Sequence, residues 1–82
     1  MSHSLRHMHT IAAELVANVA SVTARVGDSV TPTDTLVLLE SMKMEIPVLA
    51  EVAGVVIEVA VAPGDVIREG DVIAVIDESP ST

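Results

Sequence analysis

IAAELVANVASVTARVGDSVTPTDTLVLLES, residues 11–41, aligns without a gap with VLAEVAGVVIEVAVAPGDVIREGDVIAVIDE, residues 48–78, after a shift of 37 positions. The matches include glycines, acids and aliphatic residues: Ala13/Ala50, Glu14/Glu51, Val19/Val56, Val22/Val59, Gly27/Gly64, Asp28/Asp65 and Asp34/Asp71. The chain is therefore an internal duplication. Two copies of a unit that cannot cover its own apolar face are most simply stabilised by packing face to face.

Short runs of Val, Ile and Leu alternate with turn residues in both copies, such as Gly27-Asp28, Pro63-Gly64-Asp65 and Gly70-Asp71. This pattern is typical of short strands and predicts an all-β fold. A helix over 11–20 is disfavoured because Val16, Asn18 and Val19 lower its helix propensity. The expected architecture is a pseudo-twofold flattened β-barrel or sandwich made of two repeated four-stranded units. The recurring Gly-Asp turns predict a structural role for their acids rather than acid-base catalysis.

The composition excludes several classes of function. The 82 residues carry a formal charge of -8 and include no Phe, Tyr, Trp or Cys. Binding to nucleic acid or to an anionic membrane requires positive charge, which this chain lacks. The longest uncharged interior stretch, 15–24, is far shorter than the roughly 20 residues that cross a bilayer. We expect no membrane segment, no secretion signal, no enzymatic activity of the domain itself and a cytoplasmic location.

The two ends of the chain are expected to lie outside the fold. Residues 1–10 follow no apolar period and predict a disordered tail or a cloning remnant, and 79–82 predict a short disordered C-terminal tail, which leaves 11–78 as the domain. His3, His7 and His9 have no carboxylate or thiol companions in this segment, so a metal site is not predicted.

The joint between the two copies is Glu40-Ser41-Met42-Lys43-Met44-Glu45. Symmetry places this segment at the tip of a hairpin, where Lys43 would project into water with a methionine on either side. Lys43 is also the only lysine in the sequence. A protein that uses one amine for a covalent attachment gains specificity when no other lysine competes, and methionine suits a surface that contacts several partners.

This hexapeptide resembles the attachment motif of the biotinyl domain family, in which a lysine between two methionines receives biotin. The resemblance covers 11–77 and is closest to small free-standing biotinylated proteins of actinobacteria and to biotin carboxyl carrier domains. It implies covalent biotin on Lys43, with Met42, Met44, Glu40, Ser41 and Glu45 forming the tip recognised by a biotin protein ligase. It further implies a swinging arm that carries carboxyl between biotin carboxylase and carboxyltransferase subunits, so that the partners supply the catalysis.

The chain departs from the family pattern at a few positions, and three rival interpretations stay open. Glu14 and Glu51 stand where family members often have proline, and Ala17, beside Asn18, stands where they often have glycine. The two halves align without a gap, so we expect none of the inserted loop that forms a protruding thumb in some bacterial carrier subunits.

A lipoyl domain would share the fold, but it typically has aspartate before the lysine and alanine after it. A transport-adaptor module and a small hydrolase are the second and third rivals. We expect a monomer, because the surface is strongly acidic.

Overall fold

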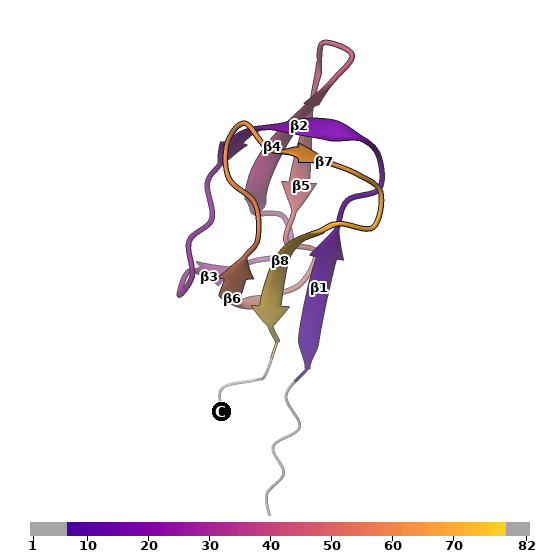
Figure 1. Cartoon of the computed structure of the whole chain (residues 1–82). Helices are drawn as coiled ribbons and strands as arrows, with labels where there is room; N and C mark the ends of the chain where they lie inside the picture. The colour runs from indigo at the N-terminus through magenta and orange to yellow at the C-terminus, as the bar shows by residue number, and fades with distance from the viewer. Residues whose placement is uncertain (1–6, 79–82) are drawn as a thin grey trace, which may run out of the picture.

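Eight short strands form the part of the chain that the computed structural model describes, residues 7–78, and no helix occurs among these residues (Figure 1). The predicted all-β class is therefore confirmed. The strands are β1 (Met8–Ala12), β2 (Ala17–Val22), β3 (Ser29–Val30), β4 (Thr35–Ser41), β5 (Met44–Leu49), β6 (Gly54–Val59), β7 (Val66–Ile67) and β8 (Val72–Asp77). Residues 7–78 accordingly contain no helix capable of crossing a membrane.

The start of the domain differs from the prediction. Residues 8–10, assigned to a tail from the sequence, belong to β1, where Met8, His9 and Thr10 pair antiparallel with β8. The predicted boundary at Ile11 is wrong, because backbone pairing with β8 extends the strand to Met8 even though the side chains of Met8 and Thr10 are exposed. The stretch 11–20 ends β1 and begins β2, with no helical turn. His3, the rest of 1–6 and residues 79–82 lie outside the described residues.

The duplication is visible in the strands themselves. β1 to β4 come from the first half of the chain, and the same shift of 37 positions places β5 to β8 in equivalent positions. One sheet has the order β1-β8-β6-β3 and the other has the order β5-β4-β2-β7, so the shift converts each order into the other. The predicted pseudo-twofold symmetry is confirmed.

The two copies are interlaced rather than stacked as separate layers. Each sheet takes two strands from each copy, because β1 pairs with β8, β3 with β6 and β2 with β7 across the halves. These cross-pairings supply backbone partners that a lone copy would leave unpaired. The sequence predicted face-to-face packing of two complete units. In the structure the two copies instead exchange strands, so that each sheet contains strands of both.

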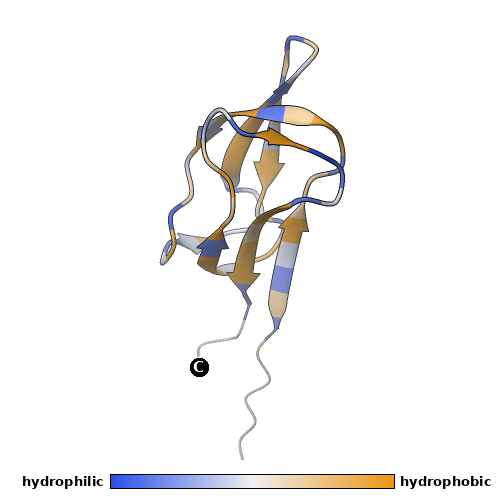
Figure 2. Ribbon diagram, viewed as in Figure 1, coloured by the Kyte–Doolittle hydropathy of each residue, from blue (hydrophilic) through white to orange (hydrophobic). Residues whose placement is uncertain are grey.

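The core lies between the two sheets and is built from equivalent aliphatic residues. Figure 2 shows that hydrophobic residues predominate along most of the strands. The repeat pair Leu36/Ile73 is fully buried. The repeat pairs Leu39/Ile76 and Val19/Val56 are at most 2% exposed. Burying one such side chain contributes about 1.5–3 kcal/mol. No polar or charged side chain is buried among the described residues, so the side-chain packing between the sheets is apolar.

The Gly-Asp turns have the structural role that their recurrence predicted. The carboxylate of Asp28 accepts a hydrogen bond of 2.9 Å from the backbone N–H of Arg25, and Asp65 does the same with Ala62. Gly27 precedes the first of these acids with a φ of 99°, a left-handed conformation that favours glycine. Asp34 and Asp71 make equivalent bonds in the turns that lead into β4 and β8. These four acids close turns.

Candidate functional site

The β4–β5 hairpin projects beyond the rest of the molecule, at the top of Figure 1. Ser41 and Met44 are the last paired residues of the two strands, so the turn consists of Met42 and Lys43 alone. The ends of the described chain meet at the other end of the domain, where the backbone N–H of Glu78 donates to the carbonyl of His7 over 2.8 Å. The predicted hairpin tip is confirmed, and it lies opposite the termini.

The backbone of this turn is unusual for its residue types. Met42 has a φ of 51° and Lys43 a φ of 68°. Two consecutive positive φ values characterise the type I′ turn, which joins twisted strands tightly and favours Asn-Gly. A methionine and a lysine adopt this left-handed conformation at a cost of order 1 kcal/mol each. Their presence here points to a use for the side chains rather than to backbone preference.

The side chains of the turn extend into solvent. Met42 is 91% exposed and Met44 61% exposed, and Lys43 between them is also exposed. A soluble protein ordinarily places polar residues in such positions. Because Lys43 is the only lysine of the sequence, the tip presents a single side-chain amine framed by two flexible apolar groups.

Two acids flank the amine on the strands below it. Glu40 and Glu45 are directly opposite one another in the β4–β5 register, and both are exposed. Like charges in facing positions of a hairpin destabilise it slightly. The pair therefore gives the base of the tip a negative charge that the strands themselves do not need.

Ser41 is turned toward the body of the domain rather than outward. It is half-buried, and its hydroxyl donates a hydrogen bond of 3.4 Å to the carbonyl of Val16 in the β1–β2 connection. This contact links the base of the hairpin to the first copy. Of the six residues in the hexapeptide, Ser41 is the half-buried one and the other five are exposed.

A shallow hollow of about 360 Å³ lies beside the turn, and it includes residues that the sequence did not indicate. Val16 and Val66 contribute exposed apolar side chains, and Asn18 contributes an amide. They meet the hairpin because β2 pairs with β7, which brings Asn18 opposite Val66. The hollow is completed by Ala17, Glu40, Ser41, Met42 and Lys43.

Among residues 7–78, which include His7 and His9, no three potential metal ligands come together. Nε2 of His9 lies 3.3 Å from a carboxylate oxygen of Glu51.

The chemistry available at the hairpin tip is that of the exposed primary amine of Lys43. Such an amine attacks an activated acyl group once it has lost its proton.

The chain belongs to the biotin/lipoyl domain family. Residues 9–76 match the family that is described as "Biotin-requiring enzyme", so the match spans both sheets and the hairpin. Among its relatives is the "Biotinylated protein TB7.3 homolog" of Mycobacterium leprae, which is 61% identical over 66 residues, 80% of this chain and 93% of the relative. The family predicted from the hexapeptide is confirmed.

Solved structures show the same fold in larger proteins and in a separate domain. A single-chain, multi-domain long-chain acyl-CoA carboxylase superimposes with a TM-score of 0.82 at 28% identity, covering 100% of this chain and 8% of that chain. The lipoyl domain of the 2-oxoglutarate dehydrogenase complex from Azotobacter vinelandii superimposes with a TM-score of 0.70 at 24% identity, covering 85% and 99% of the two chains. The latter likeness establishes the fold alone.

Proposed function

We propose that this chain is a biotin carrier of a biotin-dependent carboxylase and that biotin is joined to the side-chain amine of Lys43. The observation that carries the proposal is the placement of the sequence's only lysine in a left-handed turn between two exposed methionines. This arrangement gives a partner enzyme a single exposed side-chain amine.

The attachment is an acyl transfer that leaves the fold unchanged. The deprotonated Nζ of Lys43 attacks the acyl carbon of biotinyl-adenylate, the N–C amide bond forms, the acyl–phosphate bond breaks, and AMP departs. The amine loses its positive charge in the product. We assign the group that removes the proton to the biotin protein ligase. The two methionines and the acid pair form the surface that this ligase binds.

Biotin rather than lipoate is favoured by the residues on either side of the amine. Lipoyl domains typically have aspartate before the lysine and alanine after it, whereas Met42 and Met44 stand here. The relative from Mycobacterium leprae carries the words "biotinylated protein" in its name. Because the lipoyl domain from Azotobacter has the same fold, the fold does not distinguish biotin from lipoate, and biotin is favoured by the residues of the turn.

The position of the tip suits a mobile carrier. The hairpin points away from the ends of the described chain, so a partner can take up the tip without meeting them (Figure 1). When bound, biotin supplies a group that accepts a carboxyl at one active site and releases it at another. The tether raises its effective concentration at each site that the domain visits. Biotin carboxylase and carboxyltransferase subunits are the partners that supply catalysis.

The proposal is tested by the intact mass of the chain after incubation with biotin, ATP and an active biotin protein ligase. We expect the mass to increase by one biotinyl group in the parent and to stay unchanged in Lys43→Arg, which keeps the charge but not a reactive amine. An increase in both proteins would assign biotin to another residue. An increase by one lipoyl group with a lipoate ligase, and none with the biotin ligase, would identify the chain as a lipoyl carrier.

A second prediction concerns the methionine that follows the amine. Met44→Asp is expected to slow biotin attachment about tenfold, because an apolar contact with the ligase is lost and a charge is introduced. The side chain is 61% exposed, so the free energy of unfolding should change by no more than about 0.5 kcal/mol. The measurement is the rate of mass increase at fixed ligase concentration.

The matched control for this variant is Val26→Asp, which introduces the same charge at a 65% exposed aliphatic residue in the β2–β3 connection. Attachment to this control should proceed at the parent rate. Equal rates for Met44→Asp and the parent would remove Met44 from the ligase surface.

A further inference from the structure

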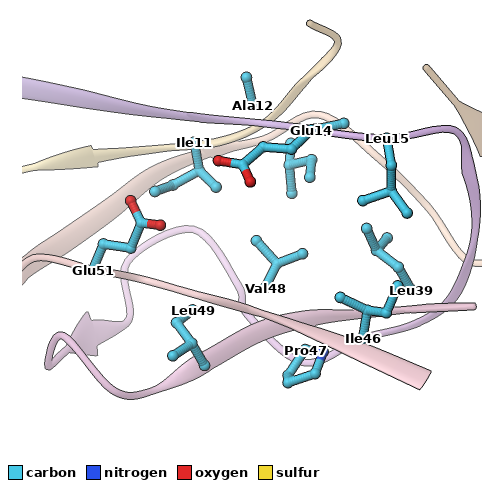
Figure 3. Close-up of a pocket in the computed structure, with 12 residues that line it drawn as sticks. Ile11, Ala12, Glu14, Leu15, Leu39, Ile46, Pro47, Val48, Leu49 and Glu51 are labelled. Atoms are coloured by element: carbon cyan, nitrogen blue, oxygen red, sulfur yellow. The ribbon is translucent and has the colours of Figure 1, made fainter. Parts of the chain in front are cut away.

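A second hollow, of about 260 Å³, opens between β1 and β5, each of which is one of the two edge strands of its sheet (Figure 3). We name it the side groove. Its walls are aliphatic and include Ile11, Leu15, Leu39, Ile46 and Val48. Figure 3 shows the carboxylates of Glu14 and Glu51 on one side of this hollow, with Leu15, Leu39 and Ile46 on the other. The groove is thus apolar at one end and acidic at the other.

The two acids are brought together by the symmetry of the fold. Glu14 and Glu51 are equivalent residues of the two copies, 37 positions apart, and both are exposed. The aliphatic residues Ile11 and Val48 are related in the same way, so the groove lies across the pseudo-twofold axis. The duplication therefore turns one acid per copy into a pair at a single site.

The backbone of Glu51 gives a further indication that its side chain is used. Its φ is 69°, a left-handed value that glycine or asparagine adopts more easily. A positive φ at a residue other than glycine indicates backbone strain, and such strain is a reason to look for a function. The side chain is 61% exposed, and Nε2 of His9 lies 3.3 Å from one of its oxygens.

The occupant of the side groove must match both ends. A second copy of the chain is disfavoured, because each copy has a charge of -8 and would bring a like-charged pair to the same place. A segment that offers an aliphatic side chain to the apolar end and a cationic side chain to the acids is complementary to both. We propose that the side groove binds a segment of a partner protein in which a branched aliphatic residue is followed by arginine or lysine.

This proposal is independent of biotin attachment, since the groove contains neither Met42 nor Lys43. It is tested with the full ¹⁵N-labelled chain and the peptide acetyl-Leu-Arg-Arg-amide as probe. We expect saturable changes in the backbone amide shifts of Leu15, Ile46 and Val48. Glu14→Gln combined with Glu51→Gln should weaken binding by about five- to tenfold, in keeping with two exposed ion pairs.

The controls separate a built groove from general attraction to an acidic protein. Glu58→Gln combined with Glu69→Gln removes two exposed acids that do not line the groove, and the affinity should change by less than about twofold. The peptide acetyl-Ser-Arg-Arg-amide, which lacks the aliphatic side chain, should bind at least about fivefold more weakly than the probe.

Several results would overturn the proposal. These are no saturable binding of the probe, equal affinity for the serine peptide, equal losses in the two double-glutamine variants, or shift changes confined to the hairpin tip. Shift changes of the same groove residues that depend on protein concentration alone would assign the groove to a second copy instead. Each outcome is separable from the mass measurement, which concerns Lys43.

Discussion

Exchanging the two turn residues for the pair that the turn favours, Met42→Asn with Lys43→Gly, is expected to raise the free energy of unfolding by about 1–2 kcal/mol and to abolish biotin attachment. Both residues have positive φ in the structure, and asparagine and glycine reach that region with less strain. Met42 is 91% exposed, so little packing is lost with its side chain. The variant would be more stable than the parent and inactive as a carrier.

The measurement is urea unfolding followed by far-ultraviolet circular dichroism, since the sequence has no aromatic residue that would report by fluorescence. The single variant Met42→Asn is the informative companion. It should gain about half of the stability and keep the amine, so that any decrease in its rate of biotin attachment reports on the methionine alone. A lower or unchanged free energy of unfolding in the double variant would contradict the strain assigned to the turn.

The tip was recognisable from the sequence by its place between the two copies, its two methionines and its lone lysine. A hairpin whose turn is occupied by methionine and lysine conflicts with local preference, and such conflicts concentrate at functional positions. The duplication located the joint, and the hexapeptide then supplied its chemistry. The Gly-Asp turns were equally predictable, because each aspartate hydrogen-bonds to a backbone N–H only three residues away.

Features that depend on long-range pairing were not predictable in the same way. The exchange of strands between the copies, the inclusion of Met8 to Thr10 in β1 and the hollow around Val16 and Val66 all arise from pairing between residues far apart in sequence. A single repeat contains no local signal for its partner strand. Glu14 and Glu51 were noticed in the sequence as a matched pair of the repeat and as departures from a family pattern. Their place in one groove was not predicted, because it depends on the interlaced fold.

The close packing of β6 against β8 leads to the second large expected effect, in which Gly54→Ala lowers the free energy of unfolding by about 2–3 kcal/mol. A Cβ on Gly54 would overlap the carbonyl oxygen of Asp77 and come within 2.8 Å of Cγ2 of Ile76. The first of these is backbone in the neighbouring strand, which cannot move aside as a flexible side chain would. The measurement is again urea unfolding followed by circular dichroism.

The equivalent residue of the other copy provides the matched control for this substitution. Ala17 occupies the position that the shift of 37 residues relates to Gly54, and its methyl group is accommodated at 5% exposure. Ala17→Gly should lower the free energy of unfolding by only about 1–2 kcal/mol, through a lost buried methyl and a more flexible unfolded chain. The φ of Gly54 is not in the left-handed region, so backbone conformation does not require a glycine there. The lack of room for a Cβ beside β8 would then account for the glycine in the second copy. An unchanged or higher stability of Gly54→Ala would show that β6 and β8 are less tightly packed than the structure has them.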